Sequence, residues 1–191
     1  MPSSRRLEGL ELLRVVGAPV PKWQTARSIH DVDRLRLPSV KFGWTIRTCR
    51  EDGKRETALF YLNNAGREKV LTVLRQHLRK TNQSQFYIVY PSWRFQFSCN
   101  IVLTEQVYCI EGKYGSQKSL SAGKTRPDFA LRIPFGMRSQ MTCYVGNPSD
   151  QVLSWLGRIL FWCRRIPKDS FYAEVALTDV PALMFYELFA L

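Results

Sequence analysis

Apolar residues recur at helical spacing in the N-terminal part of the chain. Residues 4–16 carry leucine or valine every three or four positions, and Gly17 follows where a helix commonly ends. Ser28 and Asp31 have capping-box spacing and indicate a second, short helix. Residues 67–80, REKVLTVLRQHLRK, have one apolar side and one basic side. The pattern therefore predicts a helix in each of these three stretches.

A further helix is expected in residues 147–165, NPSDQVLSWLGRILFWCRR. Asn147 is its expected N-cap, Pro148 suits the first helical position, and the residues that follow give a broad apolar side. Elsewhere, β-branched and aromatic residues gather in runs of strand length. The predicted strands are residues 39–48, 56–63, 85–91, 95–104, 106–112 and the two halves of 171–188.

The order of these elements indicates the fold class. Two helices are followed by a hairpin, a helix, three strands, a loop, a helix and a closing hairpin. Strands that follow one another directly, with helices apart from them, are typical of an α+β fold with a mainly antiparallel sheet. We therefore expect an α+β protein whose length fits one domain or two small lobes.

The closing hairpin, FYAEVALTDVPALMFYEL, carries one carboxylate on each strand. Counting outward from a loop at residues 179–182 places Glu174 directly opposite Glu187, where like charges repel. Strict alternation also points Glu187 the same way as Phe185, where a lone carboxylate is costly. Two matched carboxylates would form a clamp for Mg²⁺, a hard ion that prefers oxygen ligands. The alternative is that one glutamate pairs with a nearby arginine or lysine.

The charge balance narrows the possible partners. The formal net charge is +12 for 191 residues, and the basic residues are spread along the chain rather than concentrated in a tail. Such an excess indicates a polyanionic partner, which could be a nucleotide, another phosphorylated ligand, nucleic acid or an acidic protein.

The cysteines, the histidines and the hydropathy do not support a disulfide-rich, zinc-binding or membrane-spanning protein. The five cysteines are dispersed without a C-x-x-C pair, so neither a disulfide framework nor a zinc site is supported. His30 and His77 are the two histidines, which leaves few members for a histidine-rich metal site or a catalytic triad. No window approaches the roughly 18 consecutive apolar residues of a membrane span. We expect a cytoplasmic protein without membrane contact.

A glycine-rich basic segment, GKYGSQKSLSAGKTRPD at residues 112–128, is a second candidate site. Its glycines would let backbone N–H groups approach a phosphate, and Lys113, Lys118 and Lys124 would supply positive charge. The segment lacks the glycine patterns of P-loops and dinucleotide folds. The alternative is an exposed basic loop without a ligand.

Arg47 is a third candidate because it stands inside the strand-like run SVKFGWTIRT. An arginine in such a run needs an acidic partner or a phosphate. Lys41 lies six residues earlier, an even spacing that would put it on the same side of a strand. Alternatively, both lie on the solvent side of a half-buried hairpin.

Taken in order, these segments resemble the ATP-binding region of the phosphoenolpyruvate synthase and pyruvate phosphate dikinase family. LRVVGAPVPKW is similar to that family's helix and G-x-P-V-P-x-aromatic segment, and TIRTCREDGKRETALFYLN to its strand, acidic turn and F-L-N stretch. FYIVYPSW resembles the strand before the nucleotide-facing sheet, and IEGKYGSQKSLSAGKTRPDF a glycine-rich segment. YAEVALTDVPALMFYEL resembles the closing hairpin, so the likeness extends over nearly the whole chain.

The resemblance implies an ATP-grasp fold with ATP held between two lobes, residues 1–84 and 85–191. It implies magnesium near Glu174 and Glu187, and Arg47 as the catalytic residue on the phosphates. The residues expected to bind the nucleotide are Lys41, Arg47, Glu111, Lys113 and Lys118.

The leading hypothesis is an ATP-grasp-like protein that binds Mg·ATP. It would be a phosphotransferase or a carboxylate-activating ligase whose acceptor is a substrate or another polypeptide, because neither histidine lies in a phosphate-accepting motif. A reduced module that binds nucleotide without chemistry stays open as well.

Two alternatives come from other classes. A basic nucleic-acid-binding module without enzymatic activity would draw affinity from phosphate contacts and would stack bases on Trp93 or Phe95 of YPSWRFQF. Covalent nucleotidyl transfer at Lys41 is the other, from a faint likeness of VKFGWTIR to the lysine motif of nucleic-acid ligases.

Overall fold

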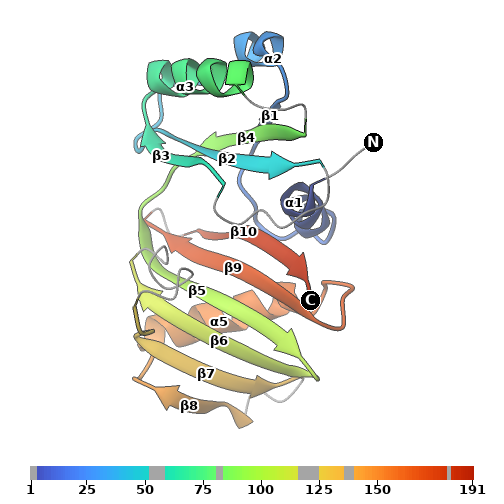
Figure 1. Cartoon of the computed structure of the whole chain (residues 1–191). Helices are drawn as coiled ribbons and strands as arrows, with labels where there is room; N and C mark the ends of the chain where they lie inside the picture. Colours follow the sequence, from blue (N-terminus) through green and yellow to red (C-terminus); the bar gives the residue numbers. More distant parts are fainter. Residues whose placement is uncertain (1–3, 52–58, 81–83, 116–124, 136–139, 180–181) are drawn as a thin grey trace. The chain divides into compact units, whose positions relative to one another are not determined.

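The computed structural model describes an α+β protein whose strands form two antiparallel sheets (Figure 1). This confirms the predicted fold class. The chain divides into two compact units, one made of Met1–Glu8 and Pro21–Trp93, the other of Gly9–Val20 and Arg94–Leu191. The described residues are 4–51, 59–80, 84–115, 125–135, 140–179 and 182–191.

The first unit contains a four-stranded sheet with strand order β1-β4-β2-β3 and helices on one face (Figure 1). Its apolar core joins Trp44 and Ile46 of the sheet to Leu74 of α3. Helix α2 begins with the predicted capping box, in which the Ser28 hydroxyl accepts a hydrogen bond from the Asp31 N–H at 3.2 Å. The elements are β1 (Gln24–Ala26), α2 (Ile29–Arg34), β2 (Trp44–Arg50), β3 (Tyr61–Ala65), α3 (Arg67–Lys80) and β4 (Gln85–Pro91).

The second unit contains a six-stranded sheet with strand order β10-β9-β5-β6-β7-β8, and α5 covers one face (Figure 1). The division of the chain falls inside α1, whose later part packs closely against β10. A Cβ at Gly9 would lie 2.0 Å from the backbone oxygen of Leu188, so only glycine fits there. The elements are α1 (Arg5–Val15), β5 (Phe95–Thr104), β6 (Val107–Tyr114), β7 (Phe129–Pro134), β8 (Thr142–Val145), α5 (Asp150–Cys163), β9 (Phe171–Thr178) and β10 (Leu183–Ala190).

The four predicted helices are confirmed, with one change at a boundary. Helix α5 begins after Ser149 and not after Asn147. The Ser149 hydroxyl accepts a hydrogen bond from the Val152 N–H at 3.4 Å, the contact that an N-cap makes, and Pro148 therefore precedes the helix. The strands β1, β7 and β8 were not predicted, because β1 and β8 are very short and β7 carries an arginine and a proline.

The predicted lobe division at residues 84 and 85 differs from the observed division. The prediction assigns β4 to the C-terminal lobe. In the structure β4 pairs with β2 along its whole length, from the pair of Trp44 with Pro91 to the pair of Arg50 with Gln85. The apolar run QFYIVYP shows that a strand is buried but not which sheet it joins. The structure places this strand inside the first unit's sheet.

Two further observations concern the helices and the cysteines. Among the described residues, no helix has the length and apolar character needed to cross a bilayer. All five cysteines are free thiols, and burial raises the pKa of Cys99 to about 12, so this thiol stays neutral.

Candidate functional site

The six-stranded sheet has one face against the apolar core and a second face that carries polar residues. On β5, Ile101 belongs to the core, and its neighbour Asn100 points to the second face because successive strand residues alternate. On β9, Val175 belongs to the core, and Glu174 points to the second face for the same reason. The face away from α5 therefore presents hydrogen-bonding and charged groups.

Strand register brings four of these residues into one row across the sheet. Glu187 of β10 pairs with Glu174 of β9, which confirms the predicted opposition of the two glutamates. Glu174 pairs in turn with Asn100 of β5, and Asn100 pairs with Glu111 of β6. Directly paired residues have Cβ atoms about 5 Å apart. We call Glu111, Asn100, Glu174 and Glu187 the polar row.

A bulge in β10 sets the direction of the Glu187 side chain. The register shifts between Phe185 and Glu187, and Phe185 and Leu188 both belong to the core. The prediction that Glu187 points the same way as Phe185 is therefore wrong. Strict alternation fails because Tyr186 is an extra residue in this strand. The bulge places the carboxylate on the polar face, away from the core.

Aromatic residues lie beside the polar row. The Tyr172 hydroxyl donates a hydrogen bond of 2.7 Å to Oε1 of Glu174, and the Tyr172 ring stacks on Phe189 with 6.2 Å between centroids. This hydrogen bond fixes the orientation of the Glu174 carboxylate. Asn100 is 9% exposed, and Glu174 and Glu187 are half-buried, so the middle of the row is shielded from water.

The donor set of the row fits a hard divalent cation. Glu174 and Glu187 occupy paired positions on β9 and β10, and Asn100 is paired with Glu174, so the row offers carboxylate and amide oxygens. Mg²⁺ commonly takes one or two carboxylates and completes its shell with waters and substrate phosphates. Within the described ranges, no group of three or more His, Cys, Asp or Glu side chains could hold a metal by itself. By the ordinary chemistry of Mg²⁺, an ion held by the two glutamates would complete its shell with waters or phosphate oxygens.

The predicted glycine-rich loop begins later than expected. Strand β6 continues to Tyr114, so Glu111, Gly112 and Lys113 are strand residues. A Cβ at Gly112 would lie 1.9 Å from the ring of Phe129, so packing against Phe129 explains this glycine without any phosphate. The prediction that a loop starts at residue 112 is wrong because β6 pairs with β7 as far as Gly112.

Lys113 already has an anionic neighbour. Its Nζ lies 3.2 Å from Oδ1 of Asp128, whose other oxygen accepts a hydrogen bond of 2.8 Å from the Tyr114 N–H. The Tyr114 N–H and then Lys113 hold the pKa of Asp128 below its usual value. A phosphate would therefore have to compete with Asp128 for Lys113. Lys118 and Lys124 lie outside the described residues.

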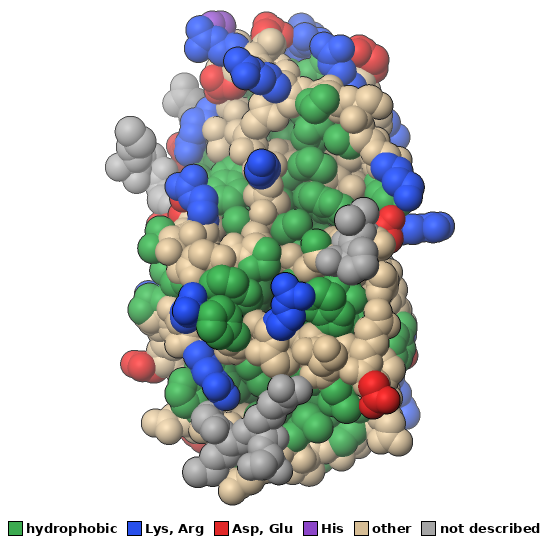
Figure 2. Space-filling model, turned by 180° about the vertical axis from the view of Figure 1, so that it is seen from behind, with side chains coloured by type: hydrophobic (Ala, Val, Ile, Leu, Met, Phe, Trp, Pro, Cys, Tyr) green, Lys and Arg blue, Asp and Glu red, His purple; other side chains and the backbone are tan. Residues whose placement is uncertain are grey.

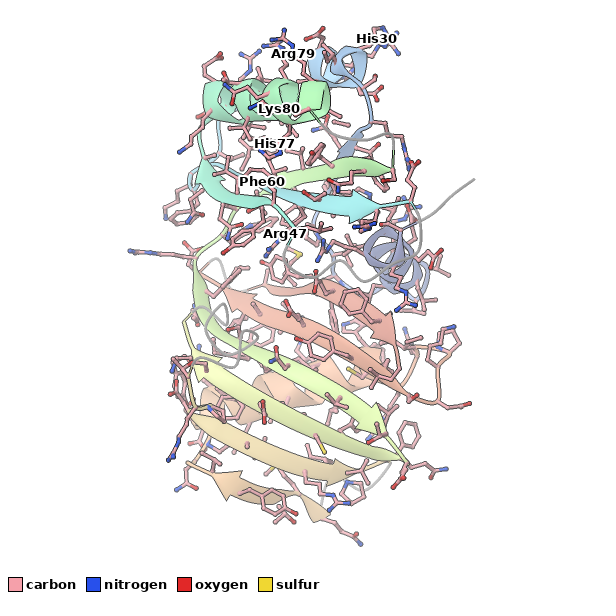
Figure 3. All side chains as sticks on the ribbon, viewed as in Figure 1. His30, Arg47, Phe60, His77, Arg79 and Lys80 are labelled. Carbon is pink, nitrogen blue, oxygen red and sulfur yellow. The ribbon has the colours of Figure 1, made fainter. Side chains whose placement is uncertain are left out.

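Arg47 lies in the four-stranded sheet, on the face away from α3 (Figure 3). Its Nε donates to the Tyr90 hydroxyl at 3.4 Å, and its guanidinium stands over the Tyr61 ring, 5.1 Å from the centroid. The two aromatic residues orient the guanidinium. A planar group held in this way is suited to bidentate phosphate binding.

Lys41 is not part of a strand. It lies in an exposed turn before β2, which begins at Trp44, and its Nζ is 5.0 Å from the ring of Phe42. The prediction that Lys41 shares a strand face with Arg47 is therefore wrong, because alternation applies only within an extended strand.

His77 packs as an aromatic side chain (Figure 3). Its ring lies 4.0 Å from the Phe60 ring at an interplanar angle of 31°, and it meets the edge of Tyr87 at 6.0 Å. Burial, and then the charge of Lys80, lower the pKa of His77. These contacts explain His77 by packing in the first unit, and His30 is exposed on α2.

The aromatic run proposed for base stacking is engaged in internal contacts. Trp93 stacks on Tyr90 with 6.4 Å between centroids, and Phe95 meets the edge of Tyr186 at 5.3 Å. Phe97 is buried in the core. The rings are packed against neighbours, so this run does not favour the nucleic-acid alternative.

Sequence reasoning missed Asn100. Within FQFSCNIVLT it reads as an isolated polar residue in a strand. Its importance follows from the position of β5 between β6 and β9, which brings Glu111 and Glu174 to its two sides. The one available signal is its even spacing from Ser98, another polar residue on the same face.

The chain matches no protein-family model and no curated protein. Its fold is similar to solved structures. N5-carboxyaminoimidazole synthetase from Staphylococcus aureus, complexed with ADP, aligns with a TM-score of 0.59 and 10% identity over 97% of this chain and 44% of that chain. Macrocyclase MdnC from Microcystis aeruginosa MRC, bound with precursor peptide MdnA, gives a TM-score of 0.55, 11% identity and coverage of 96% and 51%. L-amino acid ligase from Bacillus licheniformis aligns with a TM-score of 0.52 and 9% identity over 98% of this chain and 42% of that chain.

These similarities concern the fold. The chain spans between 42% and 51% of the length of these structures, at 9–11% identity. It has an ATP-grasp-like fold, as the sequence resemblance implied. Membership of the phosphoenolpyruvate synthase and pyruvate phosphate dikinase family stays a prediction.

Proposed function

We propose that this chain binds ATP with magnesium at the polar row and activates a carboxylate. The observation that carries the proposal is the pairing of Glu174 with Glu187 on the face of the six-stranded sheet away from α5. Two carboxylates at one cross-strand position can supply oxygen ligands to a hard cation. A metal ion that arrives on nucleotide phosphates would bring its remaining ligands with it.

The residues of the row have separate tasks in this proposal. Glu174 and Glu187 hold the ion through carboxylate oxygens, and the Tyr172 hydroxyl orients Glu174. Asn100 lies next to Glu174 and offers a further oxygen. Bound magnesium would neutralise the charge that develops on the phosphates during phosphoryl transfer.

In this proposal, basic side chains bind the phosphates of the nucleotide. Arg47 is the foremost candidate because Tyr61 and Tyr90 orient its guanidinium. Lys113 is the weaker candidate because Asp128 already accepts from it. Lys41, Glu111 and Lys118 complete the set of residues that we assign to nucleotide binding on the strength of the sequence resemblance.

The proposed reaction is carboxylate activation. The terminal phosphate passes to a carboxylate oxygen as ADP leaves, and a nucleophile then displaces phosphate from the acyl phosphate. The names synthetase, L-amino acid ligase and macrocyclase among the similar structures support a ligase over a simple phosphotransferase. The narrower family, the acceptor and a cytoplasmic location remain expectations from the sequence.

Calorimetric titration of the chain with ATP, with and without Mg²⁺, tests nucleotide binding. We expect saturable binding with magnesium and at least about tenfold weaker binding after chelation, because the carboxylate pair repels free polyphosphate. A thermal shift that rises with nucleotide concentration gives a second readout. Absence of magnesium-dependent binding contradicts the proposal.

A trapping assay tests the reaction class. The chain is incubated with Mg·ATP, a panel of carboxylates and hydroxylamine, which converts acyl phosphates to hydroxamates. We expect ADP and hydroxamate to form together with at least one carboxylate. Nucleotide binding without ADP formation from any carboxylate or amine would instead identify a binding module without chemistry.

A further inference from the structure

The outer side of α5 carries a set of aromatic and basic side chains that the proposed function does not use. The inner side of the helix is buried in the core of the second unit, whereas Phe161 is 48% exposed. Figure 2 shows the side of the molecule that carries this helix, with apolar side chains beside basic ones. We define the α5 surface as Trp155, Arg158, Phe161 and Trp162 of the helix together with Arg165, just beyond its end at Cys163. Arg158 lies three positions from Trp155 and Phe161 and four from Trp162, so these side chains form one stripe.

Arginine and aromatic side chains are stacked along this stripe. The Arg158 guanidinium stands over the Trp155 ring, 4.3 Å from its centroid. Arg165 stands 4.1 Å from the Phe161 centroid and 5.3 Å from that of Trp162. Stacking holds the guanidinium planes in place, so that less side-chain entropy is lost when they bind a carboxylate.

The charge of the α5 surface is positive, and the carboxylate of the helix, Asp150, lies in its first turn, before Trp155. No acidic residue occurs in the sequence between Asp150 and Asp169. Arg164 and Lys168 follow in the same stretch and are exposed. The surface is therefore complementary to an acidic partner.

We propose that the α5 surface docks an acidic amphipathic helix of another protein. Tryptophan, phenylalanine and arginine are enriched in protein–protein interfaces, and tryptophan and arginine are frequent among the residues that contribute most to binding, so this surface suits an interface. Arg158 lies within α5, and Arg165 lies two residues beyond its end at Cys163. Carboxylates on a partner helix would meet these two arginines, and apolar residues between the carboxylates would meet Phe161.

The geometry favours a protein partner over nucleic acid or a lipid surface. Base stacking needs an open ring face, and guanidinium groups stand over Trp155 and Phe161. Insertion into a lipid interface needs apolar side chains that project outward. Trp155 and Trp162 instead pack partly against the core, and arginines flank the exposed Phe161.

The test uses the full chain and a labelled synthetic peptide as the probe. The peptide is a designed amphipathic helix with leucines on one side and glutamates at seven-residue spacing, and a matched peptide carries glutamine in place of glutamate. Binding is followed by fluorescence anisotropy for the wild type, Arg158→Glu, Arg165→Glu and Phe161→Ala. Arg79→Glu, exposed on α3 (Figure 3), makes the same charge change elsewhere. Circular dichroism checks that each variant folds.

We expect saturable binding of the acidic peptide that weakens about tenfold in each of the two α5 arginine variants, because each loses a charge-assisted contact. Phe161→Ala should also weaken it, whereas Arg79→Glu should change it by less than about twofold. Absence of peptide binding, equal binding of the glutamine peptide, or an equal loss in Arg79→Glu overturns the proposal. It is also overturned if single-stranded RNA or phosphatidylglycerol vesicles bind this surface more tightly than the acidic peptide.

Discussion

The two sheets of this protein share a plan but differ in the chemistry of one face. Each has an apolar face that is covered by helix and joined to a core. In the four-stranded sheet, the other face carries Arg47 with Tyr61 and Tyr90. In the six-stranded sheet, it carries the polar row. The comparison shows that similar packing leaves an arginine beside aromatic rings on one sheet and a row of carboxylate and amide side chains on the other.

Packing is the first feature on which the two units are predicted to differ. A Cβ at Gly112 would lie 1.9 Å from the Phe129 ring in the six-stranded sheet, whereas one at Gly66, before α3, would meet nothing within 4 Å. We expect Gly112→Ala to lower the free energy of unfolding by about 2 to 3 kcal/mol through overpacking. Gly66→Ala should lower the free energy of unfolding by less than about 1 kcal/mol, because Gly66 directly precedes α3 and substitutions at an N-cap position have small effects of this kind.

Urea unfolding followed by circular dichroism measures both glycine variants. The double variant Gly112→Ala/Phe129→Leu should recover part of the loss, because the smaller side chain yields space. Equal stability of the two single variants would show that the Phe129 contact does not constrain the sheet.

Arg47→Ala sharpens the contrast between direct and metal-mediated phosphate binding. We expect affinity for ATP to fall about tenfold, both with and without magnesium, because a guanidinium contacts phosphate without the ion. Arg34→Ala, an exposed arginine on α2, serves as the matched control. Calorimetry measures all three proteins. If Arg47→Ala binds ATP as the wild type does, Arg47 has no part in phosphate binding.

Asn100→Ala tests the middle of the polar row. We expect a loss of about fivefold in magnesium-dependent ATP affinity, since one oxygen beside Glu174 is removed while both carboxylates remain. Ser98→Ala lies two residues away on the same face and is the control. The Mn²⁺ electron paramagnetic resonance spectrum with ATP should change in Asn100→Ala alone. An identical spectrum and affinity would remove Asn100 from the site.

The smallest predicted effect concerns His77 in the first unit. Burial lowers its pKa in the folded state, so the unfolded chain binds the proton more tightly. Stability is therefore complete above the ordinary pKa of about 6.5 and falls as the pH decreases below it. His77→Phe retains a ring against Phe60 and should flatten the pH dependence of the melting temperature between about pH 7 and 5.5. Parallel curves for the two proteins would contradict this.

The sequence predicts local features of this fold better than distant pairings. The opposition of Glu174 and Glu187 follows from a hairpin that is local in sequence, and the structure confirms it. Strict alternation of side chains does not reveal a bulge such as the one at Tyr186, so the direction of the Glu187 side chain was predicted wrongly. The place of Asn100 depends on pairing across three strands, which no local pattern encodes.

The same limit applies to the fold. The Ser28 capping box is a four-residue signal and is confirmed. The sheet that β4 joins depends on partners distant in sequence, and the apolar run QFYIVYP is compatible with either sheet. Arg47 was singled out from its own strand, whereas the aromatic residues that orient it come from β3 and β4.

The central claim is that the Glu174–Glu187 pair holds the metal of a bound nucleotide. Calorimetry of Glu187→Gln with ATP tests it most directly, because glutamine keeps the side-chain shape and removes the charge. Glu105→Gln, in the exposed turn between β5 and β6, is the control. We predict a loss of about 100-fold in affinity with magnesium, little change without it, and an unaltered fold. Magnesium-dependent affinity equal to that of the wild type would contradict the account.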